Sequence, residues 1–126
     1  MTALFHAHSG IRYLVLLFAV IAIVYFAYGL LTKKPYDKTA RMLGVIFNSS
    51  LDLNVLLGII LLFVKGYFSY QLMHIIYMFA ALAAAHVLTA VNKKRKTPSY
   101  QIALLAIAVP LILVLIGIHQ MTGRWF

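Results

Sequence analysis

The chain has 126 residues, of which 64% are hydrophobic and only 10% are charged. Its mean hydropathy of +0.97 excludes an ordinary soluble domain, because so apolar a surface with so few charges would aggregate in water. Lys and Arg number 11 against 2 Asp and Glu, for a net charge of +9, and no cysteine is present, which excludes disulfides, Cys-ligated zinc, iron–sulfur clusters and covalently attached haem. We therefore expect an integral membrane protein.

Four apolar segments lie at about residues 9–31, 42–64, 70–91 and 100–121. Each is long enough to cross the hydrocarbon core of a bilayer as a helix. The connections between them are short, so that neighbouring helices must run antiparallel. The sequence therefore predicts one all-α domain over residues 1–126, an integral membrane four-helix bundle with up-down-up-down order.

The basic residues predict the orientation of this bundle. Most of them lie in or beside the connections that follow the first and the third segment. They are Lys33, Lys34, Lys38, Arg41, Lys93, Lys94, Arg95 and Lys96. Because cationic loops stay in the cytoplasm, we expect a bacterial inner-membrane protein with both termini on the outer side. The same residues fit contact with the anionic lipid of the bilayer, and we expect no nucleic-acid partner.

Four of the five histidines are expected at one depth near the outer face. His6 and His8 open the first segment, His74 opens the third, and His119 ends the fourth. Helices one and three are diagonal neighbours across a four-helix core, so an inward His on each could hold a haem between two axial ligands. His6 and His8 cannot share a helix face, and His8 is the one in a stripe with Arg12. We expect haem b held by His8 and either His74 or His119, with Arg12 on a propionate.

A second polar layer is expected deeper in the membrane. A charged Asp inside a membrane helix costs about 2.5–3.5 kcal/mol, so Asp52 should be neutral or paired. His86 reaches a comparable depth on the third segment, as counted at a rise of about 1.5 Å per residue. We therefore predict a contact between Asp52 and His86. Such a pair could serve structure, proton transfer or the head group of a quinone.

The stretch FNSSLDLN, residues 47–54, carries polar side chains on two faces of the second helix. Asn48 and Asp52 share one face, and Ser50 and Asn54 share the other. Both faces cannot point into the core of a single bundle, and lipid would not satisfy Asn54. We therefore expect Asn48 and Asp52 to face His86 inside the bundle. Ser50 and Asn54 should then face outward and contact another membrane subunit or a second copy of the chain.

Two runs and one histidine carry a resemblance to known proteins. The run HSGIRY, residues 8–13, resembles the start of a group of small bacterial four-helix membrane proteins that are described as cytochrome-b-like. DLNVLLG, residues 52–58, and His74 at the opening of the third segment are also similar to that group. The resemblance covers most of the chain. It implies b-type haem, with His8 and His74 as the positions that match.

The second segment departs from that group. Where related sequences carry His and Gln, this chain has Asp52 and Asn54. If the group uses that position as a ligand, the deeper polar layer of this chain holds no haem.

The function predicted from these features is electron transfer, with a quinone or a partner oxidoreductase. With 2 acids and no Glu, the chain has no HExxH pair and no paired catalytic carboxylates, and it has no Gly-rich phosphate loop. An electron-transfer or accessory subunit is therefore favoured over a stand-alone enzyme. Two alternatives stay open: a cofactor-free accessory subunit of a larger membrane complex, and a protein that handles protons or metal ions through the same histidines.

Overall fold

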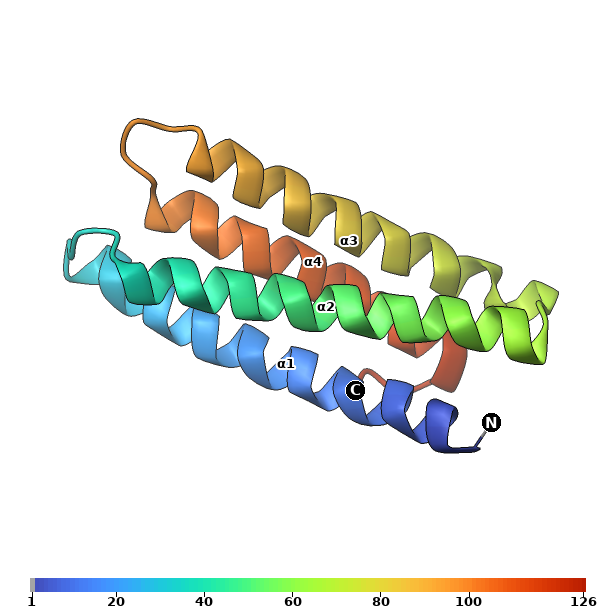
Figure 1. Cartoon of the computed structure of the whole chain (residues 1–126). Helices are drawn as coiled ribbons and strands as arrows, with labels where there is room; N and C mark the ends of the chain where they lie inside the picture. The colour runs from blue at the N-terminus through green and yellow to red at the C-terminus, as the bar shows by residue number, and fades with distance from the viewer. Residues whose placement is uncertain (1) are drawn as a thin grey trace.

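The computed structural model describes residues 2–126 of the chain, without the side chains of Thr2 and Tyr70, and forms an antiparallel bundle of four long helices (Figure 1). The helices are α1 (Thr2–Leu31), α2 (Lys38–Lys65), α3 (Leu72–Lys93) and α4 (Tyr100–Thr122), with a short 3₁₀ turn, η1 (Ser69–Gln71), before α3. All four are long and apolar enough to cross a membrane. The predicted four-helix membrane bundle is confirmed.

The first helix differs most from its expected bounds, because α1 begins at Thr2 and not near residue 9. Residues 2–8, TALFHAH, contain no Pro or Gly that would stop a helix. Hydropathy marks the part of a helix that can lie in lipid, whereas the end of a helix is set by caps and helix breakers. The apolar run therefore predicted the membrane span of α1 but not its first turns.

Both ends of α2 and of α4 have identifiable caps. Asp37 precedes α2 and accepts a hydrogen bond from the backbone N–H of Ala40 at 2.9 Å, and the Ser99 hydroxyl caps α4 in a similar way. Gly66 follows α2 with φ of 87°, and Gly123 follows α4 with φ of 75°. Glycine adopts positive φ without the steric cost that other residues meet, so these two positions end their helices.

The bundle has two ends, which we name by what they carry. The termini end holds the start of α1, the connection between α2 and α3, and the end of α4 (Figure 1). The basic-loop end holds the connections 32–37 and 94–99 with most of the Lys and Arg residues. Such an unequal distribution of Lys and Arg between the two ends determines how a membrane protein is oriented on insertion.

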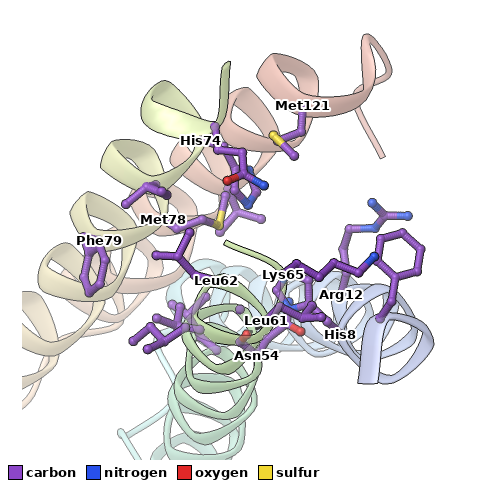
Figure 2. Close-up of a pocket in the computed structure, with 18 of the residues that line it drawn as sticks. His8, Arg12, Asn54, Leu61, Leu62, Lys65, His74, Met78, Phe79 and Met121 are labelled. Atoms are coloured by element: carbon purple, nitrogen blue, oxygen red, sulfur yellow. Dashed lines mark hydrogen bonds between the residues drawn. The ribbon is translucent and has the colours of Figure 1, made fainter. Parts of the chain in front are cut away.

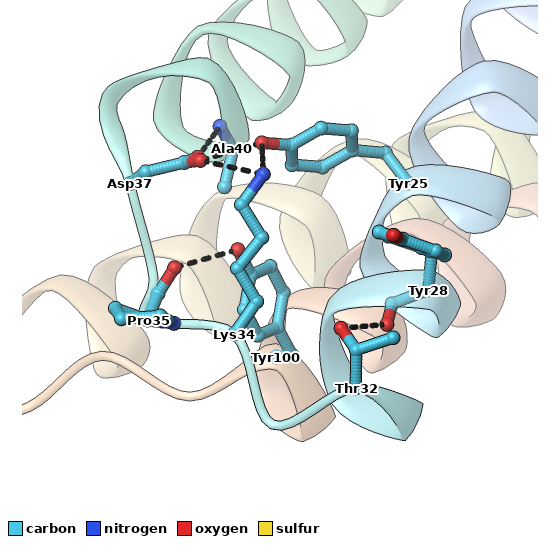
Figure 3. Close-up of polar contacts among 8 residues, drawn as sticks. All are labelled: Tyr25, Tyr28, Thr32, Lys34, Pro35, Asp37, Ala40 and Tyr100. Atoms are coloured by element: carbon cyan, nitrogen blue, oxygen red, sulfur yellow. Dashed lines mark hydrogen bonds and ion pairs between the residues drawn. The ribbon is translucent and has the colours of Figure 1, made fainter.

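Polar contacts fasten the first connection at the basic-loop end (Figure 3). The Tyr25 hydroxyl donates to Asp37 Oδ2 at 2.6 Å, and Lys34 Nζ donates to the Tyr25 oxygen at 2.8 Å. The hydrogen bond from Tyr25, together with the helix cap, lowers the pKa of Asp37 to about 2, and the bonds to Tyr25 and Asp37 raise the pKa of Lys34. The Tyr100 hydroxyl donates to the carbonyl of Pro35 at 3.0 Å and so ties α4 to the same loop.

The ring of Tyr100 also fills the space between helices at this end. It packs against Phe26 and Tyr36, with ring centroids 6.1 and 5.2 Å apart. Gly29 of α1 lies directly beneath it, because a Cβ built there would be 2.5 Å from Tyr100 Cζ. At the connection between α3 and α4, the Asn92 side chain donates to the carbonyl of Ser99 and accepts from the backbone N–H of Ser99. The basic-loop end is therefore closed by aromatic packing, and its polar groups Tyr25, Asn92 and Tyr100 are hydrogen-bonded.

Candidate functional site

A cavity of about 380 Å³ lies at the termini end (Figure 2), and residues of all four helices line it. Its volume falls in the range of about 300–1,000 Å³ that is typical of ligand and cofactor sites. Most of the wall is apolar, and none of the described residues that line it is acidic. The polar and cationic side chains of the wall are His8, Arg12, Asn54, Lys65, Gln71 and His74. Such a site suits an apolar ligand with anionic groups.

His8 enters the cavity from α1 and is held by the backbone of α2. Its Nδ1 lies 3.0 Å from the carbonyl oxygen of Asn54. Because a carbonyl only accepts, Nδ1 carries the proton and Nε2 of the neutral ring keeps a free lone pair. Gly58 leaves room for the ring, since a Cβ there would be 3.0 Å from His8 Cε1.

His74 enters from α3 and is held by α4 in the same manner. Its Nδ1 lies 2.8 Å from the carbonyl oxygen of Gly117. A Cβ at Gly117 would overlap the methyl group of Met78, so the absence of a side chain lets α3 and α4 approach at this point. Nε2 of His74, like Nε2 of His8, has no hydrogen-bond partner among the described residues.

The structure thus brings His8 and His74 to one cavity, as the helix order predicts, and places the other histidines elsewhere. His119 stacks on Trp125, with ring centroids 4.1 Å apart, and does not line the cavity. The His6 side chain is exposed and touches Phe5 edge-on. Of the two partners expected for His8, the geometry favours His74.

Two buried polar atoms in the cavity wall have no partner among the described residues, Arg12 Nε and Asn54 Oδ1. Arg12 is positioned by Tyr13, because its Nη2 donates to the Tyr13 hydroxyl at 3.0 Å. Lys65 also lines the cavity, and its Nζ lies 4.8 Å from the ring centroid of Phe5 of α1. Buried polar atoms are nearly always hydrogen-bonded, so an unpartnered donor and acceptor beside a cavity indicate a bound ligand or water.

The predicted contact between Asp52 and His86 is confirmed. His86 Nε2 lies 2.7 Å from Asp52 Oδ1. The expected place of this pair inside the bundle is wrong, however, because the two side chains are 52% and 46% exposed on the outer surface of α3 and α2.

The face assigned to Asn54 is also corrected. Asn54 lines the cavity and does not point away from the bundle, while Asn48 is buried and its Nδ2 donates to Thr89 of α3 at 3.0 Å. Ser50 is satisfied within α2 by the carbonyl of Ile46. The reason is that α2 packs against α1 on one side and α3 on the other, so two faces about 120° apart both point inward.

Sequence reasoning missed Lys65 and the role of Gly58 in this site. The available signal was a glycine one helical turn after Asn54, because a helix backbone without a side chain lets a ring from the next helix reach its carbonyls. Among the described residues, no group of three or more His, Cys, Asp or Glu could hold a metal ion.

No protein-family model matches this chain, and neither a curated protein nor a solved structure matches it. The resemblance to cytochrome-b-like membrane proteins therefore stays a prediction.

Proposed function

We propose that the protein is a b-type cytochrome-like membrane protein that binds haem in the termini-end cavity and transfers electrons. One observation carries this proposal: His8 and His74 come from different helix pairs into one cavity, each with Nδ1 on a backbone carbonyl. A carbonyl partner on one ring nitrogen fixes the tautomer and orients the other nitrogen for ligation. Two imidazoles held in this way would ligate the iron of a bound haem, which would supply one-electron transfer.

The described residues fit the chemistry of the group. Haem b is a flat apolar ring with two carboxylates, and bound haem supplies one-electron chemistry. Apolar side chains such as Leu62 and Val114 form the walls, while Arg12 and Lys65 place positive charge at the cavity for the carboxylates. The unpartnered Nε of Arg12 is a donor without another acceptor among the described residues.

We also infer that the basic-loop end faces the cytoplasm of a bacterial inner membrane, because cationic connections are retained on that side. The cavity would then lie near the outer face, where a quinone or a partner oxidoreductase would exchange electrons with it.

An absorption spectrum of protein produced with ample haem supply tests the proposal. We expect a Soret band with sharp reduced α and β bands from the wild-type chain. His8→Ala and His74→Ala should each lose the bound haem or the sharp bands, because one axial nitrogen is removed. His119→Ala is the matched control and should keep the wild-type spectrum, since His119 lies outside the cavity.

Size-exclusion profiles of all variants check that the bundle remains folded. A colourless wild-type protein would contradict the proposal and leave the cofactor-free accessory subunit as the better explanation. Equal haem content in the His8, His74 and His119 variants would contradict the assigned ligands.

A further inference from the structure

The Asp52–His86 pair is a polar group on a surface that would face lipid. Asp52 stands about halfway along α2, and His86 stands about 10 Å from the last residue of α3. Both side chains are about half exposed, at 46% and 52%. Ionisable residues inside a membrane almost always face protein or a water-filled cavity. We therefore expect another protein surface to shield this pair from lipid.

Each partner of this pair has one polar atom left over. Asp52 Oδ1 accepts from His86 Nε2, which leaves Asp52 Oδ2 and His86 Nδ1 with no partner among the described residues. Lipid chains offer neither a donor nor an acceptor. The carboxylate accepts through Oδ2, and an imidazole that donates through Nε2 also donates through Nδ1 when it carries both protons. In its ion-paired form the patch therefore carries a donor and an acceptor side by side.

The residues around the pair are small. Ser49 lies one turn from Asp52 on α2, and Ala83 and Ala90 lie one turn to either side of His86 on α3; all three are exposed. Small side chains let helices of two chains approach closely within a membrane. The polar pair and the small residues together form what we call the α2–α3 patch.

We propose that the α2–α3 patch binds a second copy of this chain through a two-fold contact. In that contact, Asp52 Oδ2 of one copy accepts from His86 Nδ1 of the other, and the reciprocal bond forms at the same time. A patch with one donor and one acceptor complements itself when it is turned about a two-fold axis. All four groups are then hydrogen-bonded and their charges cancel, and this contact does not depend on haem binding.

Cysteine cross-linking in native membranes tests this contact, because the chain has no cysteine of its own. We expect Ser49→Cys, Ala83→Cys or Ala90→Cys to form a disulfide-linked dimer on mild oxidation. Leu105→Cys is the matched control: it is equally lipid-facing, 50% exposed on α4, and should remain monomeric.

A second set of variants separates the polar contact from mere proximity. In the cysteine variant that cross-links best, Asp52→Leu combined with His86→Leu removes both polar partners, so the bundle should remain folded. We expect the loss of cross-linking to the level of the Leu105→Cys control. The proposal is overturned by monomers at all three positions, by cross-linking that survives the double substitution, or by a different protein linked at the patch.

Discussion

At the basic-loop end the rings of Phe26, Tyr36 and Tyr100 fill the space between the helices, whereas at the termini end the same helices line a cavity of about 380 Å³. The polar groups differ in the same way. Asp37 and Lys34 are bonded to each other and to neighbours, while Arg12 Nε has no partner among the described residues. Both ends are built from the same four helices. The difference between them therefore comes from the particular side chains at each end and not from the helices that form it.

The comparison separates the part of the chain that holds the bundle together from the part that is free to bind. Local features agree with the fold where stability is the main requirement, and natural proteins depart from that agreement at functional sites. The closed end restricts the loops and fixes the order of the helices. The open end places two imidazoles and two cationic side chains around the cavity.

The largest effect on stability is expected from Gly29→Ala at the closed end. The new Cβ would lie 2.5 Å from Tyr100 Cζ, and the ring is confined by its aromatic neighbours. Overpacking of this kind costs about 1–3 kcal/mol. Thermal unfolding in detergent measures it, with Gly44→Ala as the control, because nothing lies within 4 Å of a Cβ at Gly44. Equal unfolding temperatures for the two variants would show that this end is not tightly packed.

A smaller loss of stability is expected from Tyr100→Phe. The change removes the hydrogen bond of the hydroxyl to the Pro35 carbonyl at 3.0 Å but keeps the ring. A hydrogen bond of this type contributes about 0.5–1.5 kcal/mol. Tyr28→Phe is the control, because the Tyr28 side chain is exposed. This variant should have the same unfolding temperature as the wild type. The same unfolding temperature for both variants would mean that the loop is held without this bond.

Gly58→Ala at the open end should change stability by only a few tenths of a kcal/mol, because the gain in helix propensity offsets a slight crowding. Its Cβ would lie 3.0 Å from His8 Cε1, so the imidazole must shift by a few tenths of an ångström. We expect an altered haem spectrum or weaker haem retention, which absorption measures. Gly10→Ala, with nothing within 4 Å of its Cβ, should leave the spectrum unchanged. Identical spectra for the Gly58→Ala and Gly10→Ala variants would contradict the assignment of His8 as a haem ligand.

The smallest effect concerns acid. The hydrogen bond from Tyr25 and the cap at Ala40 lower the pKa of Asp37 from 3.8 to about 2, so the folded state favours the carboxylate. The stabilisation is present above about pH 4 and is lost as the pH falls toward 2. It is modest because the Asp37 side chain is still 33% exposed and its charge is screened by water. Wild type and Asp37→Asn should differ in unfolding temperature at pH 6 and converge near pH 2; a constant gap would refute the contribution.

Much of the fold could be predicted from the sequence because the length of an apolar run sets what crosses a bilayer. The short connections then predict the antiparallel order of the helices. Gly66 and Gly123 end α2 and α4, and a glycine after an apolar run is a signal of a helix end that can be seen in the sequence. The convergence of His8 and His74 followed from counting depth along antiparallel helices. No hydropathy signal set the first residue of α1, so that end was misplaced.

The rotation of α2 could not be predicted in the same way. In a soluble bundle the apolar stripe of a helix marks the core, but a membrane helix is apolar on its lipid face as well. Asn54 was therefore assigned to the wrong face, and the pair of Asp52 with His86 was placed in the core. The carbonyl partners of the histidines depend on the same rotation, together with the close approach that Gly58 and Gly117 allow.

The unequal lengths of the helices determine how the cavity meets its surroundings. α1 has 30 residues and α3 has 22, so they are about 45 and 33 Å long beside a hydrocarbon core of about 30 Å. His74 comes two residues after α3 begins, so it stands where α3 leaves the hydrocarbon. The part of the cavity beside His74 therefore lies near the aqueous boundary and not at the centre of the bilayer.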